Sequence, residues 1–307
     1  MSVALFTHPA ALAHDTGPEH PECADRLRHV LRALETPEFT PLLREQAPKA
    51  TPEQLKTVHD GDYVDAIFAM PQDRVTTIDG DTVFGPGTLE AALRAAGGAV
   101  AAVDAVMEGW AQAAFVAMRP PGHHAEYDRA MGFCFFNNAA VAARQAQRRW
   151  GLQRVAVVDF DVHHGNGTQH IFAHDAGVMY ASSHQSPCFP GTGSLAETGV
   201  GNVVNVPLPP GTNGDAFREA WQAKILPRLA AFAPEILIIS AGFDAHAADP
   251  LAQMRLKEAD FAWLTKELLA VADASCPGRV VSLLEGGYDL NALAQSCAAH
   301  VRTLMRL

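Results

Sequence analysis

The chain has 307 residues, of which 48% are hydrophobic, and 34 acidic against 23 basic residues give a net charge of −11. This composition supplies a large core, and the acidity argues against a nucleic acid partner because phosphate binding needs clustered Lys and Arg. No segment has the length and apolarity of a membrane span, so we expect no membrane partner. The five cysteines form no C-x-x-C pair, which predicts free thiols and a cytoplasmic protein.

Short apolar runs alternate with longer helical patterns along the whole chain. The apolar runs predict strands at 3–7, 113–118, 155–160, 177–181, 203–207, 236–240 and 280–284. Helical periodicity predicts helices at 24–35, 60–69, 88–108, 137–150, 214–232, 258–274 and 289–304. Residues 70–87 are rich in Asp, Gly and Pro and predict a surface loop. We therefore expect one α/β domain over residues 1–307, with a mostly parallel sheet covered by helices on both faces.

Polar, chemically capable residues follow four of the predicted strands. They are Arg119–His124 after 113–118, Asp161 to His163 after 155–160, Asp244 after 236–240, and Glu285–Tyr288 after 280–284. Ligands bind beyond the carboxyl ends of the strands in open parallel sheets. The sequence therefore predicts one functional site at this edge.

The stretch 155–168, VAVVDFDVHHGNGT, carries the strongest signal for a metal. Asp159, Asp161 and His163 alternate along an extended segment and therefore share one face. We expect Asp161, His163 and Asp244 to be metal ligands, because three protein ligands leave a position open for a water whose pKa the metal lowers. Zn²⁺ is the default for such a mixed set, and Fe²⁺ also suits two carboxylates and one imidazole.

Two adjacent histidines, His123 and His124, supply the groups for proton transfer. We expect one to act as general base and then general acid, while the other stabilises charge. Each imidazole needs a partner on its far nitrogen, and Asp159 and Asn166 are the candidates. An Asp partner favours imidazolium, whereas an Asn partner leaves the ring nearer neutral.

Three further residues are predicted to hold the substrate. Tyr288 follows two glycines and could donate its hydroxyl to an oxyanion. Phe133, next to Gly132, and Phe189 could form the walls of a narrow apolar slot for a linear aliphatic chain.

Seven segments, in order along the chain, resemble the histone deacetylase superfamily. They are HPECADR (20–26), RPPGHHA (119–125), GFCFFNNAA (132–140), VDFDVHHGNGTQ (158–169), SSHQSPCFPGTG (182–193), SAGFDAHAADP (240–250) and LEGGYD (284–289). This resemblance implies the arginase/deacetylase fold, with a parallel sheet of about eight strands flanked by helices. It also implies a zinc-dependent amidohydrolase that removes acetyl or other acyl groups from acyl-lysine-type amines.

The resemblance assigns roles to individual residues. Asp161, His163 and Asp244 match the zinc ligands; His123 and His124 match the tandem histidines, with His124 the proton shuttle; and Tyr288 matches the oxyanion-stabilising tyrosine. Asp159 matches the carboxylate behind the first histidine, and Asn166 stands where class I members have Asp and class II members have Asn. Phe133, with Gly132, and Phe189 match the tunnel walls. Arg26 resembles an arginine of an internal channel for acetate.

The superfamily also binds structural K⁺. By analogy, one K⁺ site would use Asp159, Asp161, His163, Ser182 and Ser183. A second site would involve Phe172, Asp175 and Val178.

Three other functions compete with the acyl-lysine hydrolase. An acetylpolyamine amidohydrolase would share the chemistry and take an acylated polyamine as substrate. A dinuclear manganese hydrolase of the arginase type would need a D-x-H-x-D pattern, whereas this chain has D-x-D-x-H. A non-catalytic binder or scaffold is disfavoured by the complete set of ligands, histidines and tyrosine. The sequence leaves the oligomeric state open, and a homo-oligomer is compatible with it.

Overall fold

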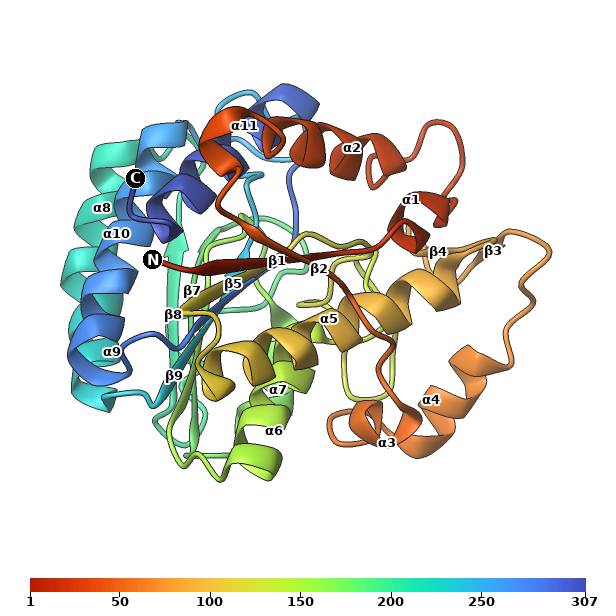
Figure 1. Cartoon of the computed structure of the whole chain (residues 1–307), viewed down its shortest axis with the longest axis horizontal. Helices are drawn as coiled ribbons and strands as arrows, with labels where there is room; N and C mark the ends of the chain where they lie inside the picture. The colour runs from red at the N-terminus through yellow and green to blue at the C-terminus, as the bar shows by residue number, and fades with distance from the viewer.

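A computed structural model describes residues 1–307. At its centre lies an eight-stranded sheet with the order β2-β1-β5-β10-β9-β6-β7-β8, in which every neighbouring pair is parallel (Figure 1). The strands are β1 (Val3–Thr7), β2 (Leu43–Gln46), β5 (Ala113–Val116), β6 (Val155–Asp159), β7 (Val178–Gln185), β8 (Val203–Leu208), β9 (Ile236–Ala241) and β10 (Val280–Leu284). The central strands β5, β10, β9 and β6 are buried throughout, as their predominantly apolar sequences predict.

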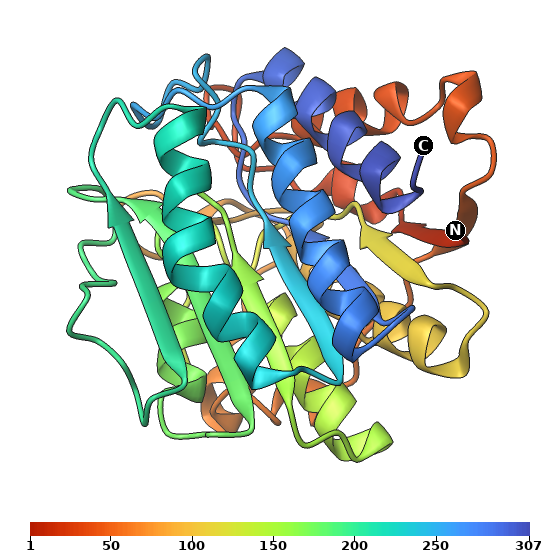
Figure 2. The same cartoon turned by 90° about the vertical axis from the view of Figure 1, so that its left-hand side faces the viewer.

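Helices cover both faces of the sheet. One face carries α5 (Thr88–Glu108), α6 (Asn138–Trp150) and α7 (Asn166–Phe172), and the other carries α2 (Ala24–Ala33), α8 (Gly214–Ala220), α9 (Leu226–Phe232), α10 (Glu258–Ser275) and α11 (Leu290–Leu304). Figure 2 shows the second layer lying in front of the sheet. The remaining short helices are α1 (Ala10–Ala13), η1 (Pro37–Phe39), α3 (Pro52–Leu55) and α4 (Gly61–Phe68). The predicted α/β architecture is therefore confirmed.

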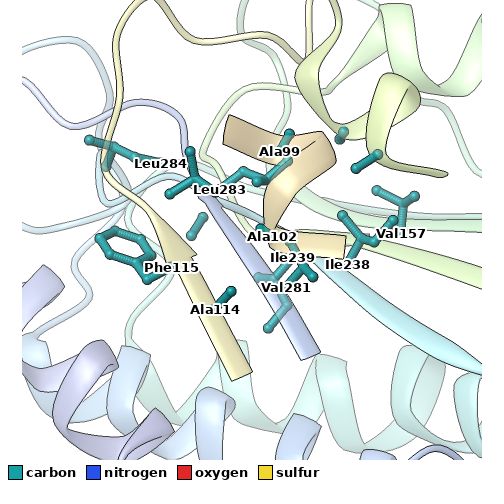
Figure 3. Close-up of a cluster of buried hydrophobic side chains, with 14 of the residues drawn as sticks. Ala99, Ala102, Ala114, Phe115, Val157, Ile238, Ile239, Val281, Leu283 and Leu284 are labelled. Carbon is teal, nitrogen blue, oxygen red and sulfur yellow. The ribbon is translucent and has the colours of Figure 1, made fainter. Parts of the chain in front are cut away.

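One continuous cluster of 87 buried apolar residues forms the core between the sheet and its helices. Figure 3 shows Ala99 and Ala102 of α5 near Val281 and Leu283 of β10. Small side chains on α5 let this long helix lie close to the sheet, and interlocked packing of this kind holds strands at fixed positions. The core thereby fixes the strand ends from which the polar loops emerge.

The short helices α1, η1, α3 and α7 were not predicted from the sequence. Three further elements differ from the sequence-based expectation for reasons that the structure makes clear. Strand β2 has the sequence LREQ and is exposed at all four positions, so it carries no apolar pattern that would reveal it. Residues 70–87, expected as a loop, contain the hairpin β3 (Thr76–Thr77) and β4 (Val83–Phe84). Residues 214–232 form α8 and α9 joined by the π-turn η2 (Trp221–Ile225), and Pro227 at the start of α9 lacks the N–H needed for a regular helical bond.

All carboxyl ends of the strands lie on one side of the molecule because the sheet is wholly parallel. In Figure 1, β1 runs from the N-terminus toward α1 and the β3–β4 hairpin, which lie on that side. None of the helices combines the length and the apolar character needed to cross a membrane.

Candidate active site

Two neighbouring strands bring the expected metal ligands together. Asp161 and His163 follow β6, and Asp244 follows β9, which pairs directly with β6. One ligand atom from each residue lies within 4.8 Å of the others, and all three residues are buried. The Nδ1 of His163 lies 3.1 Å from Asp161 Oδ1 and 3.1 Å from Asp244 Oδ2. Two carboxylate oxygens and one imidazole nitrogen are donors that fit Zn²⁺ or Fe²⁺.

Backbone groups hold the outer oxygens of the two carboxylates. Gly286 N–H donates to Asp161 Oδ2 at 2.8 Å, and Val162 N–H donates to Asp244 Oδ1 at 2.8 Å. A Cβ on Gly286 would lie 2.2 Å from Asp244 Oδ2, and one on Gly242 would lie 2.1 Å from Asp161 Oδ2. Positions 242 and 286 beside the ligands therefore require glycine, which has no side chain.

The electrostatics of this cluster favour a bound cation. Burial, together with the nearby Asp161 carboxylate, raises the pKa of Asp244 to about 7. Burial favours a neutral His163 ring, but hydrogen bonds to Asp161 and Asp244 outweigh it and raise the pKa of His163. Protons thus compensate the paired carboxylates in the absence of another cation, and a divalent metal would displace them.

The tandem histidines have different partners and different charges. His123 Nδ1 lies 3.0 Å from Asp159 Oδ2, which also accepts from the Tyr180 hydroxyl at 3.1 Å. Burial disfavours the His123 cation, yet Asp159 outweighs this effect and raises the pKa of His123 to about 10. His124 Nδ1 faces Asn166 Oδ1 at 2.7 Å, and burial with two neighbouring histidines lowers the pKa of His124 well below its usual range. The pair therefore combines a cation with a neutral ring.

A cavity of about 790 Å³ opens above the metal ligands, a volume that suits a small-molecule or side-chain site. His124, His163 and Tyr288 line it, whereas His123 does not. His124 is thus the histidine that a substrate would meet. Residues 16–21, the hairpin residues Thr77 and Val83, and Cys188 also line the cavity.

Both predicted wall residues, Phe133 and Phe189, line the cavity. The Phe189 ring centroid lies 5.0 Å from that of His124, and the Phe133 centroid lies 5.8 Å from that of Tyr288. Gly132 has φ +56°, and a Cβ there would lie 2.5 Å from Cδ2 of His124. The absence of a side chain at Gly132 thus allows the Phe133 loop to pack against the His124 ring.

Arg26 lies behind the cavity and not on its wall. Its guanidinium donates to the carbonyl oxygens of Gly287 at 2.6 Å and Glu285 at 2.5 Å. Its Cζ also lies 4.8 Å from the centre of the Tyr288 ring. Arg26 therefore supports the loop that carries Tyr288.

The sequence did not predict the structural roles of two buried carboxylates around the site, Glu285 and Glu22. Glu285 accepts from the backbone N–H of Gly122 at 2.7 Å and of His123 at 3.2 Å, which fixes the histidine loop. Burial raises the pKa of Glu285 to about 7. Glu22 forms ion pairs with Arg119 and Arg26. Both acids lie inside segments that resemble the family, but only their burial and contacts in the structure reveal that they hold the histidine loop and the two arginines in place.

The two candidate K⁺ sites differ. In the first, the buried backbone carbonyls of Asp161 and His163 accept no hydrogen bond, so these oxygens are free for a cation. In the second, the carbonyl oxygens of Phe172, Asp175 and Val178 lie 2.8, 3.0 and 2.7 Å from Asn202 Nδ2. These three carbonyl oxygens converge beside the Asn202 amide, and the second K⁺ site stays a prediction.

The fold and the cavity together define an α/β protein with an enzyme-like site at the carboxyl edge of its sheet. Residues 20–304 match the histone deacetylase domain family. The chain therefore belongs to the histone deacetylase family.

Relatives of this family cover nearly the whole chain. A histone deacetylase-like amidohydrolase of Pseudomonas aeruginosa is 43% identical over 92% of this chain and 74% of its own length. A probable deacetylase of Archaeoglobus fulgidus is 37% identical over 94% of this chain and 82% of its own length. A crystal structure of the HDA15 HD domain matches with a TM-score of 0.93 and 36% identity, covering 99% of this chain and 88% of that chain. These names support a deacetylase or amidohydrolase activity.

Proposed function

We propose that this protein is a zinc-dependent amidohydrolase that removes acetyl or other acyl groups from acyl-lysine-type amines. The observation that carries the proposal is the meeting of Asp161, His163 and Asp244 beside His124 and Tyr288 in one cavity. Fe²⁺ fits the same donors. A cytoplasmic location rests on the five free cysteines.

The chain's own residues divide the chemistry among them. Bound at the three ligands, the metal would polarise the amide carbonyl and activate water. The neutral His124 accepts the proton from the attacking water and then donates it to the leaving amine. His123, held as a cation by Asp159, stabilises negative charge nearby. Phe133 and Phe189 enclose the aliphatic stem of the substrate.

Replacing Tyr288 with Phe tests the proposed oxyanion contact. We expect kcat to fall by about 10²- to 10³-fold with KM little changed, because the lost hydroxyl acts on the transition state. Steady-state kinetics on an acetyl-lysine peptide would measure both constants. Tyr127→Phe, at an exposed tyrosine, is the matched control, and equal activity of the two variants would contradict the role of Tyr288.

An acylated polyamine is the second candidate substrate, and the charge of the cavity favours it. The lining includes Glu19 and Asp81 and no Lys or Arg. A distal ammonium group would be attracted to these carboxylates, whereas the side chain of an acyl-lysine is neutral.

Side-by-side assays of acetyl-lysine peptides, acetylputrescine and acetylspermidine would separate the two substrates. If polyamines are the substrate, Asp81→Asn should lower kcat/KM for acetylspermidine by about tenfold and leave a neutral acetyl-lysine peptide within about twofold. No turnover of any of these amides by the zinc-loaded protein would overturn the proposed function.

A further inference from the structure

A chain of hydrogen bonds leads from His124 away from the cavity toward the surface. Asn166 Oδ1 faces His124 Nδ1 at 2.7 Å, and Asn166 Nδ2 contacts Glu126 Oε1. His170 Nδ1 lies 2.8 Å from each Glu126 carboxylate oxygen. Glu126 is only 7% exposed, while the His170 side chain is 48% exposed. This series of hydrogen bonds therefore connects the buried His124 ring to the half-exposed His170 ring.

The carboxylate of Glu126 decides which way the Asn166 amide points. An ionised carboxylate only accepts hydrogen bonds, so the NH₂ group of Asn166 must face it. The amide oxygen is then left toward His124, whose Nδ1 must carry the hydrogen. This tautomer leaves the lone pair on Nε2, the ring nitrogen that a general base requires.

We propose that Glu126 is a positioning residue that fixes the amide of Asn166 and, through it, the tautomer of His124. This inference rests on the proposed function, in which His124 accepts a proton. It also accounts for Asn at position 166: a carboxylate there would face the Glu126 carboxylate at hydrogen-bonding distance, and two like charges in a buried site repel.

His170 completes the arrangement by compensating the charge of Glu126. The hydrogen bond to Glu126 is the main cause that raises the pKa of His170; Glu197 adds to the effect, while partial burial and Arg129 oppose it. The contact also lowers the pKa of Glu126 despite its burial. Glu126 is thereby kept ionised, and the ionised carboxylate fixes the orientation of the Asn166 amide.

A cycle of four proteins tests this role: the wild type, Glu126→Gln, Asn166→Asp and the double variant. Asn166→Asp alone should lower kcat by about 10²-fold with KM little changed, because the opposed carboxylates displace the partner of His124. In the double variant, the new amide at position 126 can donate its NH₂ to the new carboxylate at position 166 and accept from His170. We therefore expect kcat to recover by at least about tenfold over Asn166→Asp, a non-additive result.

Asp260→Asn is the matched control. Asp260 is also a buried carboxylate, 6% exposed, but it pairs with Arg218 away from the cavity. This control should keep the wild-type kcat. A double variant no more active than Asn166→Asp would overturn the inference.

Thermal unfolding of the same four proteins gives a reading that does not depend on substrate. Recovery of the unfolding temperature without recovery of kcat would confirm the contact and overturn its catalytic role. If Asn166→Asp does not fold, we expect the double variant to fold. A double variant that fails to fold, although Glu126→Gln folds, would contradict the inference. Absence of turnover by the wild type would instead reject the proposed function, while the unfolding cycle still reports on the Glu126–Asn166 pair.

Discussion

Replacing Asp161 with Asn is expected to remove metal and turnover together while the fold survives. The amide keeps the shape of the carboxylate and an oxygen for the Gly286 N–H, which donates to Asp161 at 2.8 Å. It removes one of the two negative charges that the cation requires. In the metal-free protein, loss of the Asp161 carboxylate relieves its repulsion of Asp244 but also removes a partner of the protonated His163, so the two effects oppose each other.

Metal content, activity and unfolding temperature measure this result. The wild type should hold about one Zn²⁺ per chain, since the structure contains one such cluster, and a second equivalent would favour the dinuclear alternative. After chelation, the wild type and Asp161→Asn should unfold at similar temperatures. Asp273→Asn, at an exposed pair with Arg306, should retain metal and turnover. Full activity of Asp161→Asn would contradict the proposed metal site.

The metal affinity of the wild type should also depend on pH. The metal must displace the proton that Asp244 binds with a pKa of about 7. Affinity should therefore weaken as the pH falls below about 7, because protons compete for the same oxygens. Zinc titrations at several pH values would measure this trend.

Replacing Glu22 with Gln should destabilise the protein by about 3–5 kcal/mol, because it leaves buried guanidinium groups without their counter-charge. Glu22 is fully buried, and each of its carboxylate oxygens accepts from Arg119 at 2.6 Å. Arg26 donates to the same carboxylate at 3.0 Å. Chemical denaturation would measure the loss. Glu38→Gln, at an exposed pair with Arg302, should cost no more than about 1 kcal/mol.

The effect of Glu22 should depend on pH in a defined direction. Burial alone would raise the pKa of Glu22, but Arg119 outweighs burial and lowers it from 4.5 to about 2. A carboxyl with a lowered folded-state pKa stabilises the protein above its unfolded-state pKa. The difference between the wild type and Glu22→Gln should therefore be constant above pH 4.5 and shrink as the pH falls toward about 2. A difference independent of pH in this interval would contradict the charge-based explanation.

The sequence predicted those features that follow from strong local patterns. Uninterrupted apolar runs identified the buried strands, and polar residues just after them identified the edge of the sheet where Asp161, His163 and Asp244 meet. Closeness to the ligands identified Asp159 and Asn166 as candidate partners of the two histidines, and the family resemblance placed Asp159 behind His123; the structure pairs Asp159 with His123 and Asn166 with His124.

Features that depend on distant partners could not be predicted in this way. Glu22 meets Arg119 across 97 positions of the chain, and no periodicity encodes such a contact. Strand β2 forms because it lies beside β1 in a parallel register, not because its own residues are apolar. Asn202 lies among the carbonyls of the second candidate K⁺ site, and only the folded backbone brings them there.

The glycines beside the ligands have a consequence for how this protein can evolve. Any side chain at Gly242 or Gly286 would collide with Asp161 or Asp244, so the chemical centre tolerates almost no variation. The mouth of the cavity is instead built from residues 16–21, the β3–β4 hairpin and the segment around Phe189, where changes meet solvent. New substrate preferences can therefore arise by exchanging these outer segments while the hydrolytic centre stays the same.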